Sequence, residues 1–294
     1  MEYWEKRGKQ LVTKQIKADD KASEKLAKEY DRLAAKFERE IAAYYTKYSK
    51  EDVIEYRDML KVLSDSERTL LYENMDEFVR DFPQYKHLMP VRESIYKLNR
   101  LEGLQLNLQT EIFRIGAIEE EVFQKHLTEA YERGYLYTLQ GLPNAQTQFM
   151  INSFAVQQAL DRKWLDSKNF SDRIWDNKRK LLKTLRDEIR DGMIRGDSYD
   201  DMMKILRNRT GVGAFEARRL IHTESAFMSV QSNAQAFKDA GIKRYEICAV
   251  MDKKTSKICR SLDGTVFSFD EAVPGSTMPP FHAFCRTTIV PVED

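Results

Sequence analysis

The feature that most constrains the fold is a run of apolar residues spaced three or four apart near the N-terminus. The run begins after Ala22, and Lys, Arg and Glu fill most positions between its members. One face of an α-helix repeats with this spacing, because the helix has about 3.6 residues per turn. The pattern therefore predicts one long amphipathic helix with a buried stripe, which consists of Leu26, Tyr30, Leu33, Phe37, Ile41, Tyr44 and Tyr48.

Further helices are expected along the first two thirds of the chain. Ser64 followed by Glu67 is the pattern of a capping box, in which each residue satisfies a backbone N–H of the other. Pro90 fits the first turn of a following helix, whose stripe would begin at Val91. Later apolar repeats predict helices over residues 119–140, 172–190, 199–209 and 214–240.

Glycines predict where several of these helices end. Gly192 and Gly196 are expected to break the helix that precedes them, because glycine is a poor helix former. The segment Thr210–Gly213 contains two glycines and is expected to form a short turn. A long helix would then run from Ala214 until Gly241 ends it.

The pattern changes after residue 241. The segments 245–250 and 286–290 are rich in β-forming residues. Asp263–Gly264, between Leu262 and Val266-Phe267, is a hairpin signal. We therefore expect an α+β protein. An elongated, mostly helical region would cover residues 1–165, and a domain of helices with a small β-structure would cover residues 166–294.

The composition excludes several classes of protein. No apolar run approaches the ~18 residues of a membrane-spanning helix, and the charged start lacks the apolar core of a secretory signal. The three cysteines are an odd number, which argues against a disulfide scaffold and for a reducing compartment. We expect a protein that is made and used in the cytoplasm, unless it leaves in a particle.

A basic stripe is the first candidate binding surface. The formal net charge of +1 argues against a protein sheathed in nucleic acid. Locally, however, four cations recur at helical spacing and share one face, where they could contact DNA phosphates or simply face water. The four are Arg179, Lys183, Arg186 and Arg190.

Cysteine and histidine near the C-terminus form the second candidate site. Cys259, His282 and Cys285 have a spacing that can hold zinc, the one cofactor that this sequence suggests. A structural zinc site normally has four ligands, so Asp252, Cys248 or His222 would have to complete the set. Two alternatives remain open: a Cys–His nucleophile pair, or small buried thiols beside a histidine that hydrogen-bonds the backbone.

The segment around Glu224 offers a third candidate. His222 and Glu224 lie on one predicted helix, where they could act in acid–base chemistry or form a polar clamp that pins the helix to a neighbouring sheet. An alternative function follows, that of a metal- or thiol-dependent hydrolase, a nuclease or peptidase, which uses Glu224, Cys259 and His282. The sequence lacks the paired acidic clusters of a two-metal site, which argues against it.

Three ordered blocks carry a family resemblance over about residues 170–294. They are His222-Thr223-Glu224-Ser225, the stretch from Asp252-Lys253-Lys254-Thr255 to Leu262-Asp263-Gly264, and Pro279-Pro280-Phe281-His282-Ala283-Phe284-Cys285-Arg286. Together they resemble the Mu protein F-like family of tailed-phage minor head proteins, also called head morphogenesis proteins. The signature positions are Thr223, Glu224, Asp252, Thr255, Cys259, Asp263, Gly264, His282, Cys285 and Arg286.

The resemblance implies a non-enzymatic virion component. Such proteins lie in the capsid interior or portal region, and the expected partners are the portal protein, scaffold or major capsid protein, and phage DNA, with no membrane. Assembly would take place in the host cytoplasm, and the signature residues would mainly form a polar core that holds the fold. Some relatives append a toxin or other enzyme domain; eight residues follow Arg286, so none is expected here.

Three positions depart from the family pattern. His222 stands where arginine is usual, Ser256 where many relatives have cysteine, and Thr287 where many have a second cysteine. The chain thus has two thiols fewer than many relatives for any metal site.

Overall fold

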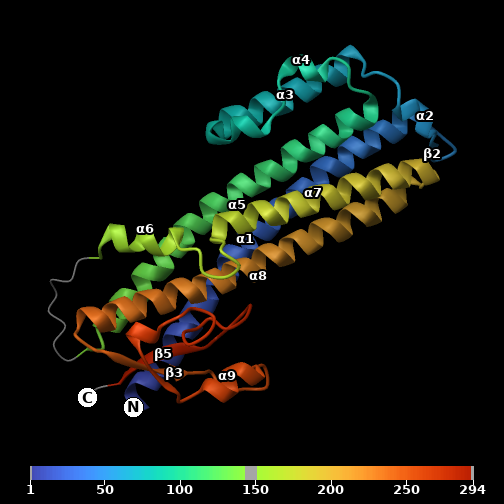
Figure 1. Cartoon of the computed structure of the whole chain (residues 1–294). Coiled ribbons are helices and arrows are strands. Elements are labelled where there is room, and N and C mark those ends of the chain that lie inside the picture. The colour runs from blue at the N-terminus through green and yellow to red at the C-terminus, as the bar shows by residue number, and fades with distance from the viewer. Residues whose placement is uncertain (1, 143–150, 293–294) are drawn as a thin grey trace. The chain divides into compact units, whose positions relative to one another are not determined.

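The computed structural model describes residues 2–142 and 151–292 of the chain. By their contacts, the residues form two compact units (Figure 1). The first, here called the sheet unit, comprises residues 1–24, 121–173 and 217–294. The second, here called the helical unit, comprises residues 25–120 and 174–216.

Four long helices contribute residues to both units. They are α1 (Glu2–Tyr48), α5 (Arg100–Leu139), α7 (Phe170–Arg195) and α8 (Tyr199–Asp239). The long N-terminal helix predicted from the apolar spacing is confirmed. All of its predicted stripe residues are buried except Tyr48, which is half-buried.

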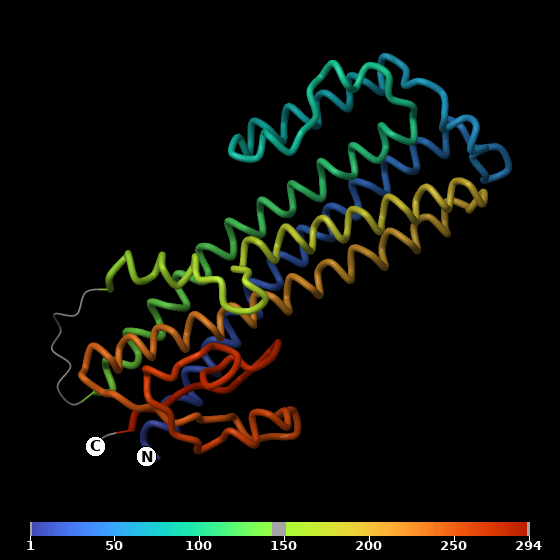
Figure 2. Tube along the Cα trace, in the orientation of Figure 1, coloured from blue at the N-terminus to red at the C-terminus, as the bar shows by residue number. Residues whose placement is uncertain are grey.

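In the helical unit, segments of the four long helices run side by side (Figure 2). Their core includes a fully buried polar cluster, in which Lys178 Nζ lies 2.6 Å from Glu119 Oε1. Tyr30 donates its hydroxyl proton to the same carboxylate over 2.6 Å. Burial lowers the pKa of Lys178 and raises that of Tyr30.

Short elements complete the helical unit. The predicted capping box is confirmed, because Ser64 and Glu67 bond each other's backbone at the start of α3. The helix predicted to begin at Pro90 is wrong: only one turn forms there, and Asn99 and Glu102 cap each other to begin α5 afresh. The short elements are β1 (Ser49–Lys50), β2 (Val53–Ile54), α2 (Tyr56–Met59), α3 (Asp65–Asp81), η1 (Pro83–Leu88) and α4 (Arg92–Ile95).

Two predicted helix breaks are wrong for one physical reason. Helix α7 runs through Gly192, and α8 runs unbroken through Gly213. A Cβ at Gly192 would lie 2.6 Å from the sulfur of Met202, and one at Gly213 would lie 2.6 Å from the ring of Tyr30. These glycines allow close helix packing and do not form turns. Gly196, with φ +76°, follows the end of α7 as predicted.

In the sheet unit, three antiparallel strands have the order β4-β3-β5. The predicted β-segments are confirmed as β3 (Arg244–Cys248) and β5 (Thr288–Val292), and Tyr245 of β3 faces Phe267 on one side and Pro291 on the other. The predicted hairpin at Asp263–Gly264 is wrong. Helix α9 (Lys257–Leu262) precedes it, and Gly264, with φ +75°, turns the chain into β4 (Val266–Ser268).

The sheet unit also contains α6 (Ser153–Asp161) and η2 (Phe269–Glu271). Its apolar core joins the sheet to the C-terminal part of α8, with Phe237, Tyr245 and Ile289 among the buried residues. The start of α1 packs on β5, where a Cβ at Gly8 would come within 3.0 Å of Thr288.

The predicted α+β class, with a mostly helical N-terminal part, is confirmed. Both compact units take residues from either side of position 165. The division into a helical region of residues 1–165 and a domain of residues 166–294 stays a prediction. No helix in the described ranges combines the length and the apolar character that a bilayer span requires.

Candidate functional site

The three sequence blocks meet in the sheet unit, and Thr223 forms the first link between them. The Thr223 hydroxyl on α8 accepts a hydrogen bond from the backbone N–H of Phe284 over 3.3 Å. It donates its own proton to the carbonyl of Arg219, 2.7 Å away. Phe284 has a φ of 57°, a conformation uncommon outside glycine. The hydroxyl thus fixes the turn that contains His282 and Cys285.

Asp252 and Arg286 form the second link. The guanidinium bonds both carboxylate oxygens, each over 2.6 Å, in a bidentate ion pair. This pairing holds the pKa of Asp252 well below its usual range. The same carboxylate accepts the backbone N–H of Lys254, and Thr255 donates to the carbonyl of Val250 over 2.7 Å. The loop after β3 is thus tied to the turn before β5.

Asp263 ties the end of α9 back to the sheet. Its carboxylate accepts the backbone N–H of Ala249 over 2.7 Å. The backbone N–H of Gly264 bonds the carbonyl of Ile247 over 2.9 Å. These two signature residues therefore have a structural role at the turn.

Glu224 lies within a different set of partners. Its carboxylate accepts a hydrogen bond from the Trp164 indole over 3.1 Å and forms an ion pair with Arg173. Burial raises the pKa of Glu224, and Arg173 opposes that shift. Glu224 is not in the cluster formed by Cys259 and His282. Glu224 thus joins α8 to Trp164 and to Arg173 of α7, and not to the sheet as the polar-clamp hypothesis expected. The structure does not assemble the three residues of the hydrolase alternative.

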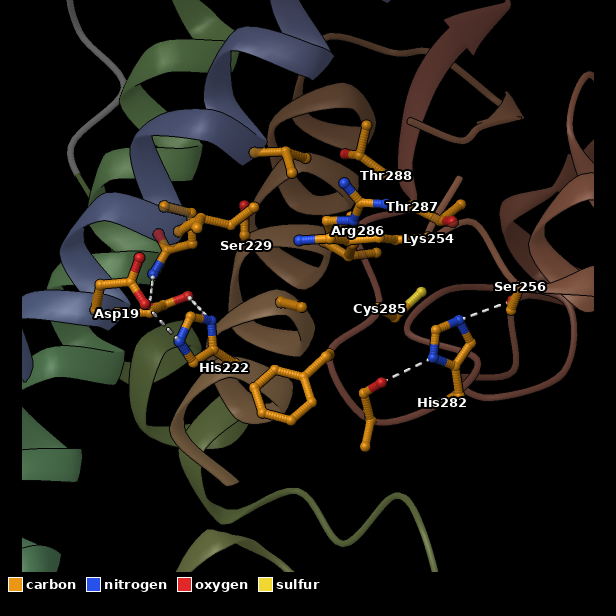
Figure 3. A pocket seen from close by; sticks show the side chains of 18 of the residues that line it. Asp19, His222, Ser229, Lys254, Ser256, His282, Cys285, Arg286, Thr287 and Thr288 are labelled. Carbon is orange, nitrogen blue, oxygen red and sulfur yellow. Dashed lines mark hydrogen bonds and ion pairs between the residues drawn. The ribbon is translucent and has the colours of Figure 1, made fainter. Parts of the chain in front are cut away.

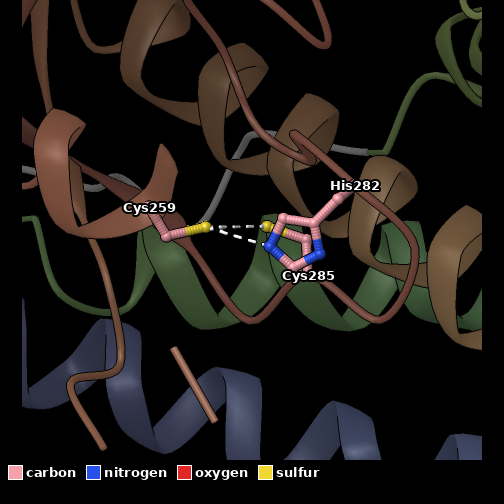
Figure 4. Close-up of side chains that lie close together, drawn as sticks. All are labelled: Cys259, His282 and Cys285. Carbon is pink, nitrogen blue, oxygen red and sulfur yellow. Dashed lines mark hydrogen bonds between the residues drawn. The ribbon is translucent and has the colours of Figure 1, made fainter. Parts of the chain in front are cut away.

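Cys259, His282 and Cys285 come together as the sequence spacing predicted (Figure 4). Cys259 Sγ lies 3.2 Å from His282 Nε2 and 3.7 Å from Cys285 Sγ. Both thiols are buried, and all three donor atoms lie within 4.8 Å of one another. Within the described ranges this is the single group of its kind among histidine, cysteine and acidic side chains.

The surroundings favour loss of the thiol proton from Cys259 and oppose its loss from Cys285. Hydrogen bonds from Cys285 and Ser256 lower the pKa of Cys259. The neighbouring sulfur of Cys259 and burial raise the pKa of Cys285. Ser256, which stands where many relatives have cysteine, also lies 2.9 Å from His282 Nε2 through its hydroxyl.

None of the three proposed fourth ligands lies in this cluster. Asp252 pairs with Arg286, and Cys248 is buried in β3, where burial raises its pKa to about 11. His222 lies 3.5 Å from Asp19 through Nδ1. The cluster therefore has three protein donors from the candidate set and no more.

A pocket of about 670 Å³ in the sheet unit borders the cluster (Figure 3). Figure 3 shows Asp19 and His222 on one side of it, and Ser256, His282 and Cys285 on the other. Burial lowers the pKa of His222, although two aspartates of α1 lie close to it. His222, which stands where relatives have arginine, thus joins α8 to α1.

Not all four cations of the basic stripe on α7 are available to contact DNA phosphates. Arg186 turns toward α5, where it donates to Gln109 Oε1 over 2.5 Å. Arg179 pairs with Asp176 over 2.7 Å, and Arg190 pairs with two aspartates on its own helix. Lys183 is exposed. A DNA contact here stays a prediction, and an anion would have to compete with these acidic neighbours.

Several site residues were missed by the sequence analysis. Trp164 and Arg173 hold Glu224, and Asp19 bonds His126 over 2.7 Å as well as His222. Each partner lies 50 or more residues from the group that it contacts. A single sequence carries no signal that pairs such distant residues.

The fold and the site can now be compared with those of known protein families. Helices form most of the chain, and its C-terminal part has a small antiparallel sheet with polar contacts that join three separate blocks. Asp252 and Asp263 are exposed, so the signature residues do not together form the buried polar core that the resemblance implied. Residues 183–290 match the model of the family described as Phage Mu protein F like protein. The matched family is the one that the three sequence blocks resemble, and the match covers the C-terminal part of the chain. Searches of the curated proteins and of solved structures gave no match.

Proposed function

We propose that this protein is a minor head protein of a tailed phage that acts in head morphogenesis. The match of residues 183–290 to the phage Mu protein F like family is the observation that carries this proposal. The contacts among the three blocks support it, because Thr223, Asp252 and Arg286 are used to hold the turns of the domain together. A structural domain needs such contacts, whereas an active site needs groups left available to substrate.

The protein is proposed to be non-enzymatic. The Glu224 carboxylate is buried and engaged by Trp164 and Arg173, so it is not placed to transfer protons beside Cys259 and His282. This geometry argues against the hydrolase alternative.

The proposed location is the capsid interior or the portal region of the virion. The proposed partners are the portal protein and the scaffold or major capsid protein, and the role is head assembly or genome delivery. A formal net charge of +1 is consistent with a protein held mainly through contacts with other proteins.

Mass spectrometry of purified particles tests this proposal. Particles are collected from cells that produce the encoding phage, and peptides of this chain are quantified against those of the portal and coat proteins. We expect a few copies per particle that remain after washing, while an equally abundant host protein is removed. Complete absence from particles would refute the proposal.

DNA contact through α7 is a further part of the proposal. Exposed Lys183, together with Arg179 and Arg190, would contact phosphates, so affinity for duplex DNA should fall steeply with salt. Lys183→Glu should weaken binding in a fluorescence anisotropy titration. Lys204→Glu is the matched control, since Lys204 is an exposed lysine paired with Asp201 on α8. No binding at about 50 mM salt would leave α7 as a solvated surface.

A further inference from the structure

The two separations from Cys259 Sγ, to His282 Nε2 and to Cys285 Sγ, are close to those of atoms around one metal ion, and all three donor atoms lie within 4.8 Å of one another. A tetrahedral zinc ion has Zn–S distances of about 2.3 Å and Zn–N distances of about 2.0 Å, which puts two bound sulfurs roughly 3.8 Å apart and sulfur and nitrogen roughly 3.5 Å apart. The two sulfurs here are 3.7 Å apart, and Cys259 Sγ is 3.2 Å from His282 Nε2. A disulfide would instead need about 2.05 Å.

The imidazole of His282 is oriented as a metal ligand. Its Nδ1 lies 2.8 Å from the carbonyl of Ala283, which can only accept, so Nδ1 carries the proton. Nε2 therefore presents a lone pair toward Cys259 and Ser256. A backbone carbonyl that fixes the tautomer in this way is the usual second partner of a zinc-binding histidine.

We infer that Cys259, His282 and Cys285 bind one Zn²⁺ ion through two thiolates and Nε2, with a water molecule as the fourth ligand. Soft thiolate donors with an imidazole favour zinc over magnesium or calcium. Water can reach the fourth position, because Ser256, His282 and Cys285 also line the pocket of about 670 Å³. Binding releases the two thiol protons to solvent, so the two thiolates balance the charge of the ion. This site is independent of the proposed role in the virion.

The ion would join two segments that are distant in the sequence. Cys259 lies on α9, and His282 and Cys285 lie on the turn before β5, 23 residues or more further along the chain. Closing that loop costs conformational entropy, which metal binding offsets. The zinc would thus stabilise the same turn that Thr223 and Arg286 contact.

Metal analysis of the full chain tests this inference. The protein is purified without exposure to air, freed of metal with a chelator, and titrated with Zn²⁺ or Co²⁺. We expect about one zinc per chain, and a cobalt spectrum with the sulfur-to-metal charge-transfer band of two thiolates. Cys259→Ser, Cys285→Ser and His282→Ala should each weaken zinc binding at least tenfold. Cys248→Ser is the matched control, since Cys248 is a buried thiol outside the cluster, and should bind as the unaltered chain does.

A gain-of-ligand variant keeps the test independent of folding defects. The hydroxyl of Ser256 lies 2.9 Å from His282 Nε2, so Ser256→Cys should supply a third thiolate and tighten zinc binding. A third thiolate in the cobalt spectrum would support the assigned position of the ion. Zinc that fails to bind the reduced protein, binding that depends equally on Cys248, or a Cys259–Cys285 disulfide in the anaerobically purified chain would each overturn the inference.

Discussion

One ion pair in the helical unit and one in the sheet unit differ sharply in burial. In the helical unit, Lys178 and Glu119 form an ion pair whose side chains are 2% and 1% exposed. In the sheet unit, Asp252 and Arg286 pair at 42% and 24% exposure, where water competes with them. A lone charge is costly only where water cannot reach it. Breaking the Lys178–Glu119 pair should therefore cost far more stability than breaking the Asp252–Arg286 pair.

The largest effect is expected from breaking the buried pair. Lys178→Met leaves the Glu119 carboxylate enclosed without its cation, which should lower the free energy of unfolding by about 3–5 kcal/mol. Urea unfolding measures this loss. The double variant Lys178→Met with Glu119→Gln removes both charges and should recover part of it. A single variant within about 1 kcal/mol of the unaltered protein would contradict the proposed difference between the buried and the exposed pair.

A smaller loss is expected from the partly buried pair of the sheet unit. Arg173→Met leaves Glu224 with the Trp164 indole as a remaining donor, so we expect a loss of about 2–3 kcal/mol. The loss should shrink in acid, because burial already raises the pKa of Glu224 and a neutral carboxyl needs no cation. Urea unfolding at pH 7 and pH 4.5 checks both statements. A loss that grows in acid would contradict them.

The buried carboxyl group of Glu40, in the helical unit, should lower the free energy of unfolding at neutral pH. Burial raises the pKa of Glu40 to about 7, although Asn107 donates to it over 2.5 Å. Between its unfolded pKa of about 4.5 and pH 7, the folded chain binds more protons here, so stability falls as pH rises.

Glu40→Gln removes this dependence and keeps an oxygen for Asn107. We expect the variant to be more stable than the unaltered chain by roughly 3 kcal/mol at pH 8, and nearly equal to it at about pH 4.5. Thermal unfolding at the two pH values measures the difference. Equal stability at pH 8 would show that the Glu40 pKa is not raised.

The smallest expected changes in stability come from substitution of two glycines on α8, and the two changes should have opposite signs. Gly213→Ala would place a methyl group against Tyr30 and should destabilise the protein by about 1–2 kcal/mol. Gly211→Ala meets nothing within 4 Å, so the better helix former should stabilise it by up to about 1 kcal/mol. Thermal unfolding of the pair checks the sign of each change. Two changes of the same sign would contradict the close packing of α8 on α1.

The elements that local spacing controls could be predicted from the sequence. The stripe from Leu26 to Tyr44, the capping box at Ser64 and the strands around Tyr245 and Ile289 follow from side-chain periodicity and backbone preferences. The cluster of Cys259, His282 and Cys285 was predicted because few residue types bind metals and their spacing is recognisable.

What failed depended on contacts between distant segments. Gly192 and Gly213 have the composition of turns, and only the side chains of Met202 and Tyr30 show why glycine is needed within a helix. Arg186 has the spacing of a solvent-facing cation, yet Gln109 from another helix binds it. Such partners are set by tertiary packing, which overrides local preference.

The strands at the two borders of the small sheet resist addition of a further chain. Strand β4 has three residues, and Pro291 in β5 lacks the backbone proton that a new neighbour would need. Short or proline-containing edge strands are common safeguards against aggregation. This design would keep two copies of the chain from joining edge to edge through their sheets.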